Sequence, residues 1–328
     1  LRLDGWSTWA NNTSPLTTFK NINKISVECW YATESFTAQR SAIISQDNNS
    51  SGFGIEIGPT GTIYAYFYLD GSKQELYSLI PITKYKWNLI AFTVNVENGE
   101  AFLYLNGRNV GTKAFNKSDR YLNLASDNLF IGRSARLNYF DVFPLNVLNG
   151  AIDELMIFDT IKNENYYLDK YNENSNLIPD LEIDAKKRFQ GDYLRPIFHA
   201  IPNSAWTNES YGLIFFNQKY HLFFQKNPNG PYLYFMHWGH LSSSDLINWK
   251  EEKIALAPGA NLESFGIWSG CSILDKTGFP QFFYTGVNGN WASINKAISI
   301  DSSLIDLKKP DSNPIIDRAP SKYPNIDF

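Results

Sequence analysis

Short stretches of alternating apolar and polar residues, separated by turn pairs that contain glycine, restrict the fold of this chain most strongly. Residues 25–31, 63–69 and 90–96 each alternate in this way. Alternation with period two predicts strands that bury one face. The Asp-Gly pair at 70–71 and the Asn-Gly pair at 106–107 tolerate the positive φ angles of tight hairpins. The pattern therefore predicts an antiparallel β-sandwich.

Composition supports a β-rich protein and excludes several classes of partner. The 328 residues favour two domains, and 16% of them are aromatic while only 19% are charged. The net charge of -4 is spread without blocks, so we expect no nucleic-acid partner. No apolar run approaches the roughly eighteen residues of a membrane span. Cys29 and Cys271 lie in apolar runs of different domains, so both are expected to be buried free thiols.

The chain divides into three parts by its pattern. We predict an all-β first domain over residues 1–174, with one short helix at 162–171. Residues 175–194 form a connector that is rich in charged and polar side chains. Strand patterns return over residues 195–328. There YHLFF at 220–224 and PQFFYTG at 280–286 occupy matching places, which is typical of successive propeller blades.

Two features of the first domain leave alternatives open. The three tyrosines of 63–69 either form a stacking platform for sugars or lie on a face that the second sheet or second domain covers: Tyr64, Tyr66 and Tyr68. Three acids carry hard oxygen ligands of the kind that calcium prefers: Asp4, Asp153 and Glu154. Because no loop supplies five or six oxygens in register, we do not expect a calcium site.

Residues 195–240 concentrate the chemistry of the chain. All four histidines lie there (His199, His221, His237 and His240), together with tryptophans, amides and the carboxylate of Glu209. Aromatic faces stack on sugar rings, and amides with a carboxylate hold hydroxyls. This mixture predicts a sugar pocket. We expect the histidines to be mainly structural, with His237 ambiguous, because a zinc site at His237 and His240 lacks two further ligands.

Both parts of the chain resemble known families. ISVECWY, KWNLIAFTV, NGEAFLYLNGRNVG, NLFIGRS and GAIDELMIFDT resemble the concanavalin A-like jelly roll of the laminin-G type, over roughly 1–174. RPIFH, WTNESYG, YHLFFQKNP, MHWGH, SSDLINW, IAL and WSGC, in this order from residue 195, resemble the family 32 glycoside hydrolases. That family implies a five-bladed propeller, here the N-terminal part of one, that cleaves β-fructofuranosides of the sucrose, inulin or levan type.

The second resemblance also implies a mechanism and a site. It implies a retaining double displacement on an oligosaccharide or polysaccharide, without metal or organic cofactor, by a secreted or periplasmic enzyme. Glu209 stands at the position of the nucleophilic aspartate. Six further residues match substrate-binding positions: Trp206, Asn208, Gln225, Trp238, Trp268 and Ser269. The resemblance implies no oligomeric state.

The site also departs from the family pattern. Asn-Asp-Pro-Asn-Gly reads Asn-Glu-Ser-Tyr-Gly here, so Glu209 replaces an aspartate and Tyr211 an asparagine. An extra methylene moves the carboxylate by about 1.5 Å, and a misplacement of that order costs about a hundredfold in rate. The family's Arg-Asp-Pro segment and general acid are expected beyond Phe328. Two rivals therefore stay open: a non-catalytic carbohydrate-binding propeller, and a hydrolase for another furanoside or a pyranoside.

Overall fold

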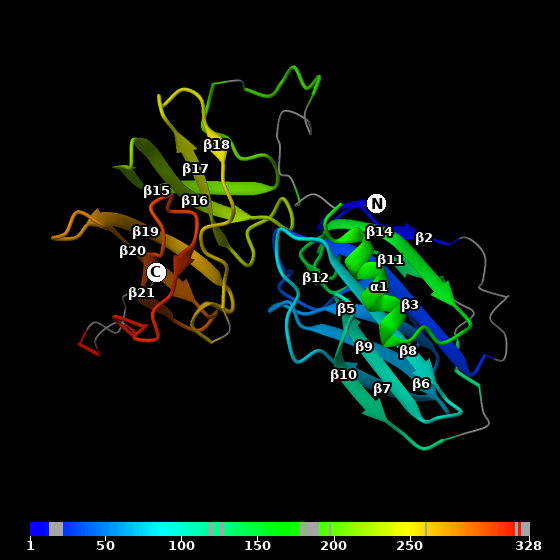
Figure 1. The fold of residues 1–328 in the computed structure, drawn as a ribbon. Coiled ribbons are helices and arrows are strands. Elements are labelled where there is room, and N and C mark those ends of the chain that lie inside the picture. The colour runs from blue at the N-terminus through cyan, green and yellow to red at the C-terminus, as the bar shows by residue number, and fades with distance from the viewer. Residues whose placement is uncertain are drawn as a thin grey trace. The chain divides into compact units, whose positions relative to one another are not determined.

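The computed structural model separates into two units, Leu1–Glu182 and Ile183–Phe328 (Figure 1). It describes residues 1–12, 22–117, 121–124, 128–177, 181, 190–196, 198–259, 261–318 and 321–322. The division falls inside the segment that the sequence marks as a connector, whose charged run lies mostly outside the described residues. Strands dominate both units, so the all-β prediction is confirmed.

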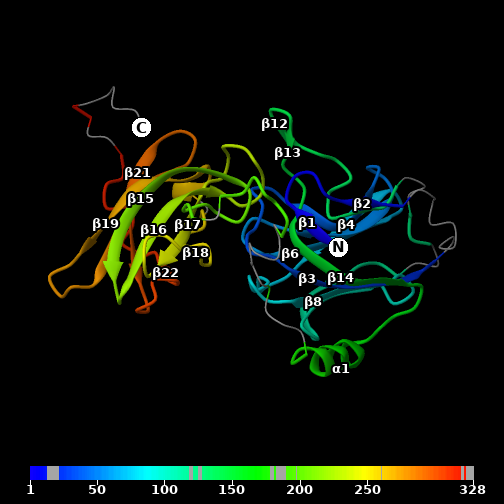
Figure 2. The ribbon, with the colours of Figure 1, turned by 90° about the horizontal axis from the view of Figure 1, so that it is seen from above.

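The first unit contains two six-stranded antiparallel sheets packed face to face (Figure 2). The first sheet has the order β1 (Arg2–Asp4), β14 (Asn149–Phe158), β3 (Lys24–Ala32), β8 (Asn88–Asn95), β9 (Glu100–Leu105) and β10 (Arg108–Ala114). The second has the order β2 (Ala10–Asn11), β11 (Phe130–Ile131), β4 (Ser41–Asp47), β5 (Gly52–Ile57), β6 (Ile63–Leu69) and β7 (Ser72–Tyr77). A small hairpin joins β12 (Tyr139–Phe140) to β13 (Phe143–Pro144).

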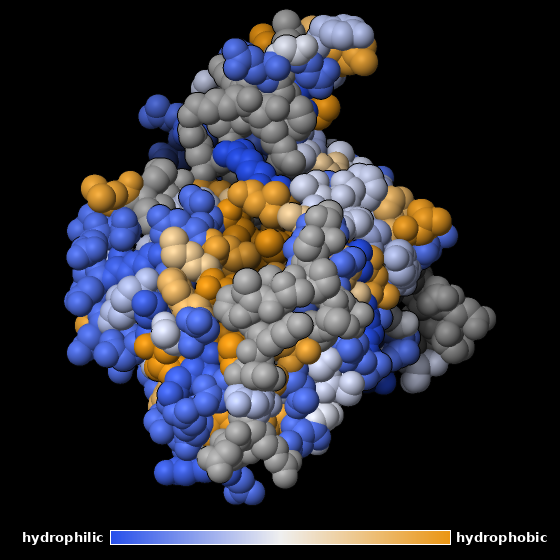
Figure 3. All heavy atoms as spheres, turned by 90° about the vertical axis from the view of Figure 1, so that its right-hand side faces the viewer, coloured by the Kyte–Doolittle hydropathy of each residue, from blue (hydrophilic) through white to orange (hydrophobic). Residues whose placement is uncertain are grey.

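Period-two alternation places the core of this unit between its two sheets. Val27 of β3, Phe67 of β6 and Phe92 of β8 are buried in one apolar cluster. Asp70 and Gly71 adopt φ angles of 54° and 72°, so the Asp-Gly pair forms the expected turn between β6 and β7. On the face drawn in Figure 3, hydrophilic residues cover much of the described surface around a smaller apolar area.

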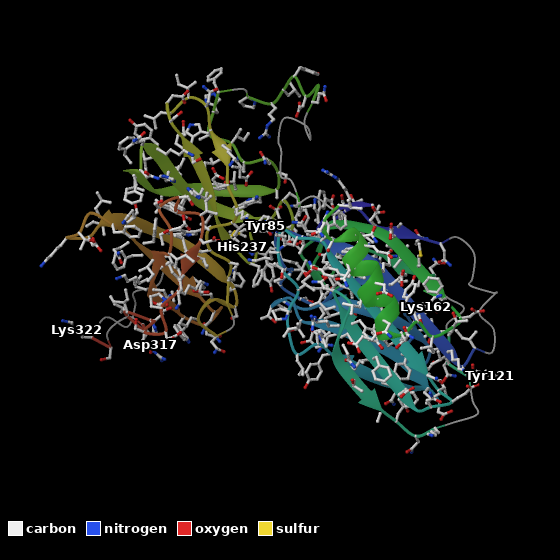
Figure 4. All side chains as sticks on the ribbon, viewed as in Figure 1. Tyr85, Tyr121, Lys162, His237, Asp317 and Lys322 are labelled. Carbon is white, nitrogen blue, oxygen red and sulfur yellow. The ribbon has the colours of Figure 1, made fainter. Side chains whose placement is uncertain are left out.

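Helix α1 (Glu164–Asn174) packs on the outer face of the first sheet and is shifted by two to three residues from the expected span. It begins there because Asn163 Oδ1 accepts a hydrogen bond from the Tyr166 backbone N–H at 3.0 Å, which caps the first turn. Lys162, just before the helix, lies over the Tyr166 ring (Figure 4). Lys170 Nζ contacts the fully buried Glu28 carboxylate at 2.7 Å and thereby anchors the helix to β3.

Two of the tyrosines of β6 lie under cationic side chains of the same unit. Tyr66 and Tyr68 are buried, and Tyr64 is half-buried. The Arg40 guanidinium carbon lies 3.4 Å from the Tyr64 ring centroid, and Lys73 Nζ lies 3.9 Å from that of Tyr66. Arg40, just before β4, and Lys73 of β7 therefore occupy the faces that a sugar would need.

The acidic residues considered for calcium have other roles. Asp4 Oδ1 accepts hydrogen bonds from the backbone N–H groups of Trp6, Ser7 and Thr8, which fixes a turn. Glu154 contacts Lys170 of α1 at 2.9 Å. Within the described ranges, no group of three or more histidine, cysteine, aspartate or glutamate side chains is arranged to hold a metal ion.

The second unit contains two four-stranded antiparallel sheets, each formed by strands in consecutive order. The first sheet comprises β15 (Trp206–Phe216), β16 (Lys219–Asn227), β17 (His237–Ser243) and β18 (Lys250–Glu251). The second comprises β19 (Gly266–Leu274), β20 (Pro280–Val287), β21 (Ala292–Ser299) and β22 (Leu307–Lys308). A four-stranded meander is the unit of a propeller blade, and the two repeated sequence segments form β16 and β20, as predicted.

An apolar cluster joins the two sheets of this unit. Phe223 and Trp238 of the first sheet and Phe282 and Tyr284 of the second are buried in it. Both cysteines are free, but only Cys29 is buried. The expectation for Cys271 was wrong because its side chain lies on the face of β19 away from this cluster, where it is exposed. In the described part of the chain, no helix is long and apolar enough to cross a membrane.

Candidate functional site

A β-bulge in β15 sets the position of Glu209. Thr207 pairs with Lys226, and Ser210 pairs with Phe224, so two residues of β15 stand opposite the single residue Gln225. These two residues are Asn208 and Glu209. Because a bulge breaks the regular alternation of side chains, it re-aims the residues that it contains, and Glu209 is exposed.

A second bulge lies at the matching place of β19. Ile267 pairs with Gly286, and Gly270 pairs with Tyr284, so Trp268 and Ser269 stand opposite one residue of β20. Successive sheets thus carry the same irregularity near the start of their first strand. The repeat is visible only in the strand register, because the two sequences at the bulges differ.

The two bulges meet at a hydrogen bond. Ser269 Oγ donates to Glu209 Oε2 at 2.8 Å, across sixty residues of sequence. Further along the same strands, Ser272 Oγ donates to the Gly212 carbonyl at 3.0 Å. β15 and β19 therefore lie side by side, and Glu209 and Ser269 are in contact.

Two amides on the first sheet orient one another next to Glu209. Asn208 Nδ2 donates to Gln225 Oε1 at 3.2 Å, and Thr207 Oγ1 donates to the Gln225 carbonyl at 3.0 Å. Gln225 is almost fully buried, whereas Asn208 is exposed. The bond fixes the Asn208 amide with its nitrogen toward Gln225, which leaves the Asn208 oxygen as the group available to a ligand.

The tryptophans divide into different roles. Trp206 is half-buried at the start of β15, where its backbone N–H donates to the Gly230 carbonyl at 3.2 Å. Trp238 differs from the expectation of a ligand contact because it is 0% exposed. Its Nε1 donates to the Trp268 carbonyl at 2.8 Å, and this hydrogen bond fixes the backbone of the second bulge. Half-buried Trp268 is thereby fixed beside Ser269.

Two buried donors at this place have no hydrogen-bond partner among the described residues. They are the Tyr211 hydroxyl and the Trp268 indole N–H. The family pattern that the sequence resembles has an asparagine in place of Tyr211. In the sequence, Tyr211 stands out only as a departure from that pattern. Its phenolic O–H, two residues after Glu209, is the signal that was missed.

A buried ion pair supports the first bulge. Lys226 Nζ lies 2.6 Å from Glu251 Oε1, and the two side chains are only 2% and 3% exposed. Glu251 Oε2 also accepts a hydrogen bond from the Asn203 backbone N–H at 2.5 Å. The pair therefore ties β16 and β18 to the segment that enters β15, three residues before Trp206.

His221, His237 and His240 are buried with structural partners, whereas His199, which was also expected to be structural, is exposed. His221 Nδ1 and His240 Nε2 are 2.9 Å apart, and the His240 ring stacks on Phe223 at 4.6 Å. Burial and then the neighbouring His221 lower the pKa of His240 to about 3, so this pair is neutral near pH 7. His237, labelled in Figure 4, is buried with its Nδ1 2.9 Å from the Phe235 carbonyl oxygen.

Two further acids of the second unit, Asp245 and Asp275, hold turns. Asp245 Oδ1 accepts hydrogen bonds from the backbone N–H groups of Ile247 and Asn248. Hydrogen bonds, first from the Asn248 side chain, lower its pKa. Asp275 caps its own hairpin in the same way, through the backbone N–H of Thr277. Glu209 thus differs from these acids, since its recorded partner comes from another sheet.

The arrangement presents one carboxylate, one of whose oxygens is held by a hydroxyl, beside amide and aromatic groups. Such a carboxylate can attack an electrophilic carbon, because the hydroxyl orients it without neutralising its charge. It can equally hold a sugar hydroxyl. Carboxylate, amide and indole are the groups that recognise carbohydrates.

Each unit matches a model of a known protein family. Residues 199–327 match the glycosyl hydrolases family 32 N-terminal domain, and residues 6–165 match the concanavalin A-like lectin/glucanases superfamily. The two matches cover the same parts of the chain as the two resemblances found in the sequence.

Individual relatives match the second unit. A raffinose invertase of Escherichia coli is 44% identical over 97 residues, which are 30% of this chain and 20% of the relative. A sucrose-6-phosphate hydrolase of Zymomonas mobilis is 42% identical over 107 residues, 33% of this chain and 21% of the relative. The chain therefore spans about a fifth of the length of these relatives.

Among solved structures, fructan 1-exohydrolase IIa of Cichorium intybus is 30% identical with a TM-score of 0.36. The match covers 37% of this chain and 24% of that one.

Proposed function

Because residues 199–327 carry the N-terminal domain of glycosyl hydrolase family 32, we propose that this chain supplies the nucleophile of an enzyme that cleaves β-fructofuranosides. Relatives named invertase, sucrose-6-phosphate hydrolase and β-fructofuranosidase support a fructosyl substrate of the sucrose, inulin or levan type. The five-bladed propeller is part of the proposal, since the described residues hold two blade-like sheets.

In the proposed mechanism Glu209 attacks the anomeric carbon of the fructosyl unit as the bond to the glycosidic oxygen breaks and the protonated leaving group departs. Water then hydrolyses the fructosyl–Glu209 ester. The Ser269 hydrogen bond to Oε2 leaves Oε1 to form the covalent bond. Retaining hydrolysis also needs a second carboxyl about 5–5.5 Å away as general acid. The contact between Glu209 and Ser269 is the single observation that carries the proposal, because it brings the expected nucleophile and its expected neighbour together from separate sheets.

Trp206, Asn208 and Trp268 are proposed to shape the fructosyl subsite. Asn208 presents its amide oxygen to a hydroxyl, and the rings offer apolar faces to the sugar. Gln225 and Trp238 act through them, because both are buried. The first unit is proposed to brace the catalytic part. Secretion or periplasmic export also belongs to the proposal, since an enzyme that degrades a polymer has to meet it outside the cytoplasm.

Activity on sucrose, inulin and levan tests the proposal in the protein that carries this chain. Release of fructose is expected, and Glu209→Gln is expected to lower the rate by about 10⁴-fold or more, as loss of a nucleophile does. A fructosyl adduct on the peptide that contains Glu209, found by mass spectrometry after acid quenching, would identify the attacking group.

The matched control is Asp311→Asn, which removes an exposed acid from the same unit and is expected to leave the rate unchanged. Equal rates in wild type and Glu209→Gln would exclude Glu209 as nucleophile.

One observation favours a second candidate, a carbohydrate-binding protein that does not hydrolyse its ligand. Glu209 and Tyr211 both depart from the family pattern at the reacting position, and an extra methylene displaces a nucleophile. In that case wild type binds fructans without cleaving them, and Glu209→Gln weakens binding. Cleavage of an arabinan or xylan instead of a fructan would assign the third candidate, a hydrolase for a different furanoside or pyranoside.

A further inference from the structure

A row of aromatic rings continues from Trp268 of the candidate site. The ring centroids of Trp268 and Phe265 lie 6.4 Å apart, and those of Phe265 and Tyr234 lie 5.5 Å apart at an interplanar angle of 87°. Trp268 stands directly before Ser269, whose hydroxyl donates to Glu209. Tyr234 therefore meets Phe265 edge to face, and the row begins next to the group that is proposed to react.

These rings lie outside the apolar core of the second unit. Phe223 and Trp238 are fully buried in the cluster that joins the two sheets. Tyr234, Phe265 and Trp268 do not belong to that cluster, and each is half-buried. A ring that serves only packing gains most when it is fully buried. A half-buried row beside amides and a carboxylate keeps apolar surface for a ligand, as sugar sites do.

The segment that carries Tyr234 is held in a fixed conformation. The Tyr232 carbonyl accepts hydrogen bonds from the Tyr234 backbone N–H at 3.1 Å and from Asn227 Nδ2 at 2.8 Å. Phe235 has a φ angle of 52°, which is unfavourable for a bulky side chain. Buried His237, labelled in Figure 4, donates from Nδ1 to the Phe235 carbonyl at 2.9 Å and holds this strained residue. Such strain persists where the surroundings impose it, and ligand sites are one such place.

The segment that carries Phe265 lies against the first one. Gly266 forms a parallel bridge with Met236, and the Ile267 backbone N–H donates to the Met236 carbonyl at 2.8 Å. A Cβ atom at Gly266 would lie 2.6 Å from the Met236 nitrogen, so glycine permits this close approach. The Phe265 backbone N–H donates to the Val287 carbonyl at 2.9 Å. Both segments are thus ordered before a ligand binds, which lowers the entropic cost of binding.

We propose that Tyr234, braced by Phe265, forms a further sugar subsite that takes the third unit of an oligosaccharide or polysaccharide whose terminal fructosyl unit lies at Glu209. The two steps along the row, 6.4 and 5.5 Å, are comparable with the spacing of neighbouring sugar units. A disaccharide ends before Tyr234, whereas a longer chain reaches it. Tyr234 is therefore a specificity-determining residue that selects substrates by length. The selection in cleavage rests on the proposed function, but the binding of sugar at Tyr234 does not require turnover.

Sucrose and the trisaccharide 1-kestose are the matched probes, because they differ by one fructosyl unit. Calorimetric titration in the protein that carries this chain, with Glu209→Gln present to prevent cleavage, measures both dissociation constants. Adding Tyr234→Ala is expected to raise the Kd of 1-kestose by roughly fivefold to tenfold, as removal of a contact ring does, and to leave that of sucrose unchanged. Adding Tyr234→Phe keeps the ring and should preserve the affinity for 1-kestose.

Phe279→Ala is the matched control for lost packing. Phe279 is also half-buried and meets Phe216 edge to face, with centroids 5.4 Å apart and an interplanar angle of 80°. Phe216 ends β15, whereas the candidate site lies near the start of that strand. Phe279→Ala is therefore expected to leave the ratio of the two dissociation constants unchanged.

The two probes also separate the subsite from the proposed function. If both sugars are cleaved, Tyr234→Ala should raise KM for 1-kestose by the same factor and leave kcat/KM for sucrose unchanged. Cleavage with KM values that do not depend on Tyr234 would remove the subsite and leave the proposed function. Binding that depends on length and on Tyr234, without cleavage by the parent protein, would remove the hydrolysis and leave the subsite.

Three binding results would overturn the subsite. One is an equal loss of affinity for sucrose and 1-kestose in Tyr234→Ala. Another is an affinity for 1-kestose that Tyr234→Ala changes no more than Phe279→Ala does. The third is a folded protein that binds neither sugar.

Discussion

The tyrosine face of β6 and the paired bulges of β15 and β19 are both rich in aromatic and polar groups, but they differ in how those groups are satisfied. On β6, Tyr66 Oη bonds to Ser45 Oγ at 2.8 Å, and Tyr68 Oη donates to Asp47 Oδ1 at 3.0 Å. Cations lie over the rings of Tyr64 and Tyr66. At the bulges, two buried donors have no partner among the residues that the structure describes, and they lie beside an exposed carboxylate.

The difference indicates that aromatic composition alone does not identify a site. On a regular strand, polar side chains can pair with side chains of nearby strands. The Tyr66 and Tyr68 hydroxyls of β6 are accordingly hydrogen-bonded within the unit. A bulge interrupts that pairing and leaves groups pointing elsewhere. Unpaired donors and a re-aimed acid are therefore better indicators of a ligand site than a row of tyrosines.

The two regions also differ in the burial of their ion pairs. Breaking the buried pair is expected to have the largest effect on stability. Lys226 and Glu251 are buried, whereas Arg40 and Glu75 of the β6 face are 41% and 33% exposed. Lys226→Met strands a buried carboxylate and is expected to lower the free energy of unfolding of the second unit by about 3–5 kcal/mol. Hydrogen exchange of the β16 and β17 amides measures the loss.

Two further variants serve as controls for that prediction. Arg40→Met is expected to cost at most about 1 kcal/mol, because its ion pair is exposed to solvent. Lys226→Met combined with Glu251→Leu should recover most of the stability, since no unpaired charge remains. A Lys226→Met cost no larger than that of Arg40→Met would contradict the structural role of the buried pair.

Acidification is expected to destabilise the second unit more than the first, because all four histidines lie in the second unit. The pKa of His240 is about 3 in the folded chain, mainly through burial, against about 6.5 when unfolded. Between these values the unfolded state binds the proton and the folded state does not. Stability from this group is complete above pH 6.5 and falls on acidification by about 1.4 kcal/mol per pH unit.

Hydrogen exchange at pH 7, 6 and 5, corrected for its intrinsic pH dependence, measures this slope in the amides of each unit. His240→Gln cannot take the proton and should flatten the slope of the second unit. Exposed His199→Gln should leave the slope as it is. An equal slope in wild type and His240→Gln would show that other groups cause the acid sensitivity.

The smallest effect is expected on the tyrosine face. Tyr66→Phe removes the hydrogen bond to Ser45 and should cost about 1 kcal/mol. Binding of soluble glycans, followed by isothermal calorimetry, should not change, because Lys73 covers the ring. Weaker glycan binding in Tyr66→Phe would break the comparison and restore the platform interpretation for β6.

Much of the fold followed from local sequence pattern. Alternation predicted β3, β6 and β8, and the Asp-Gly pair predicted the turn after β6, because strand faces and turn angles depend on neighbours in sequence. Asn163, one residue before α1, shows the limit of this reasoning. The predicted helix began too early because a cap is defined by a hydrogen bond, not by composition.

The site was predictable in its members but not in their arrangement. The motif order placed Glu209 and Ser269 in one site, and the structure joins them at 2.8 Å. Trp238 was expected to face a ligand but is fully buried, and Cys271 was expected to be buried but is exposed. In both cases the pattern identified a strand, while the face that each residue occupies depends on how the sheets pack.

By itself, the sequence determined that this chain forms two β-rich units and that Glu209 is the acid to examine, because period, turn chemistry and motif order are properties of neighbouring residues. Tertiary structure alone decided where the strands bulge and which hydroxyl holds Glu209. It also decided which buried donors, the Tyr211 hydroxyl among them, lack a partner among the described residues. The bulges arise from the register within the β15–β16 and β19–β20 pairs, and the hydrogen bond to Glu209 joins strands about sixty residues apart. Register is set by packing and hydrogen bonds across the sheets, which no local pattern contains.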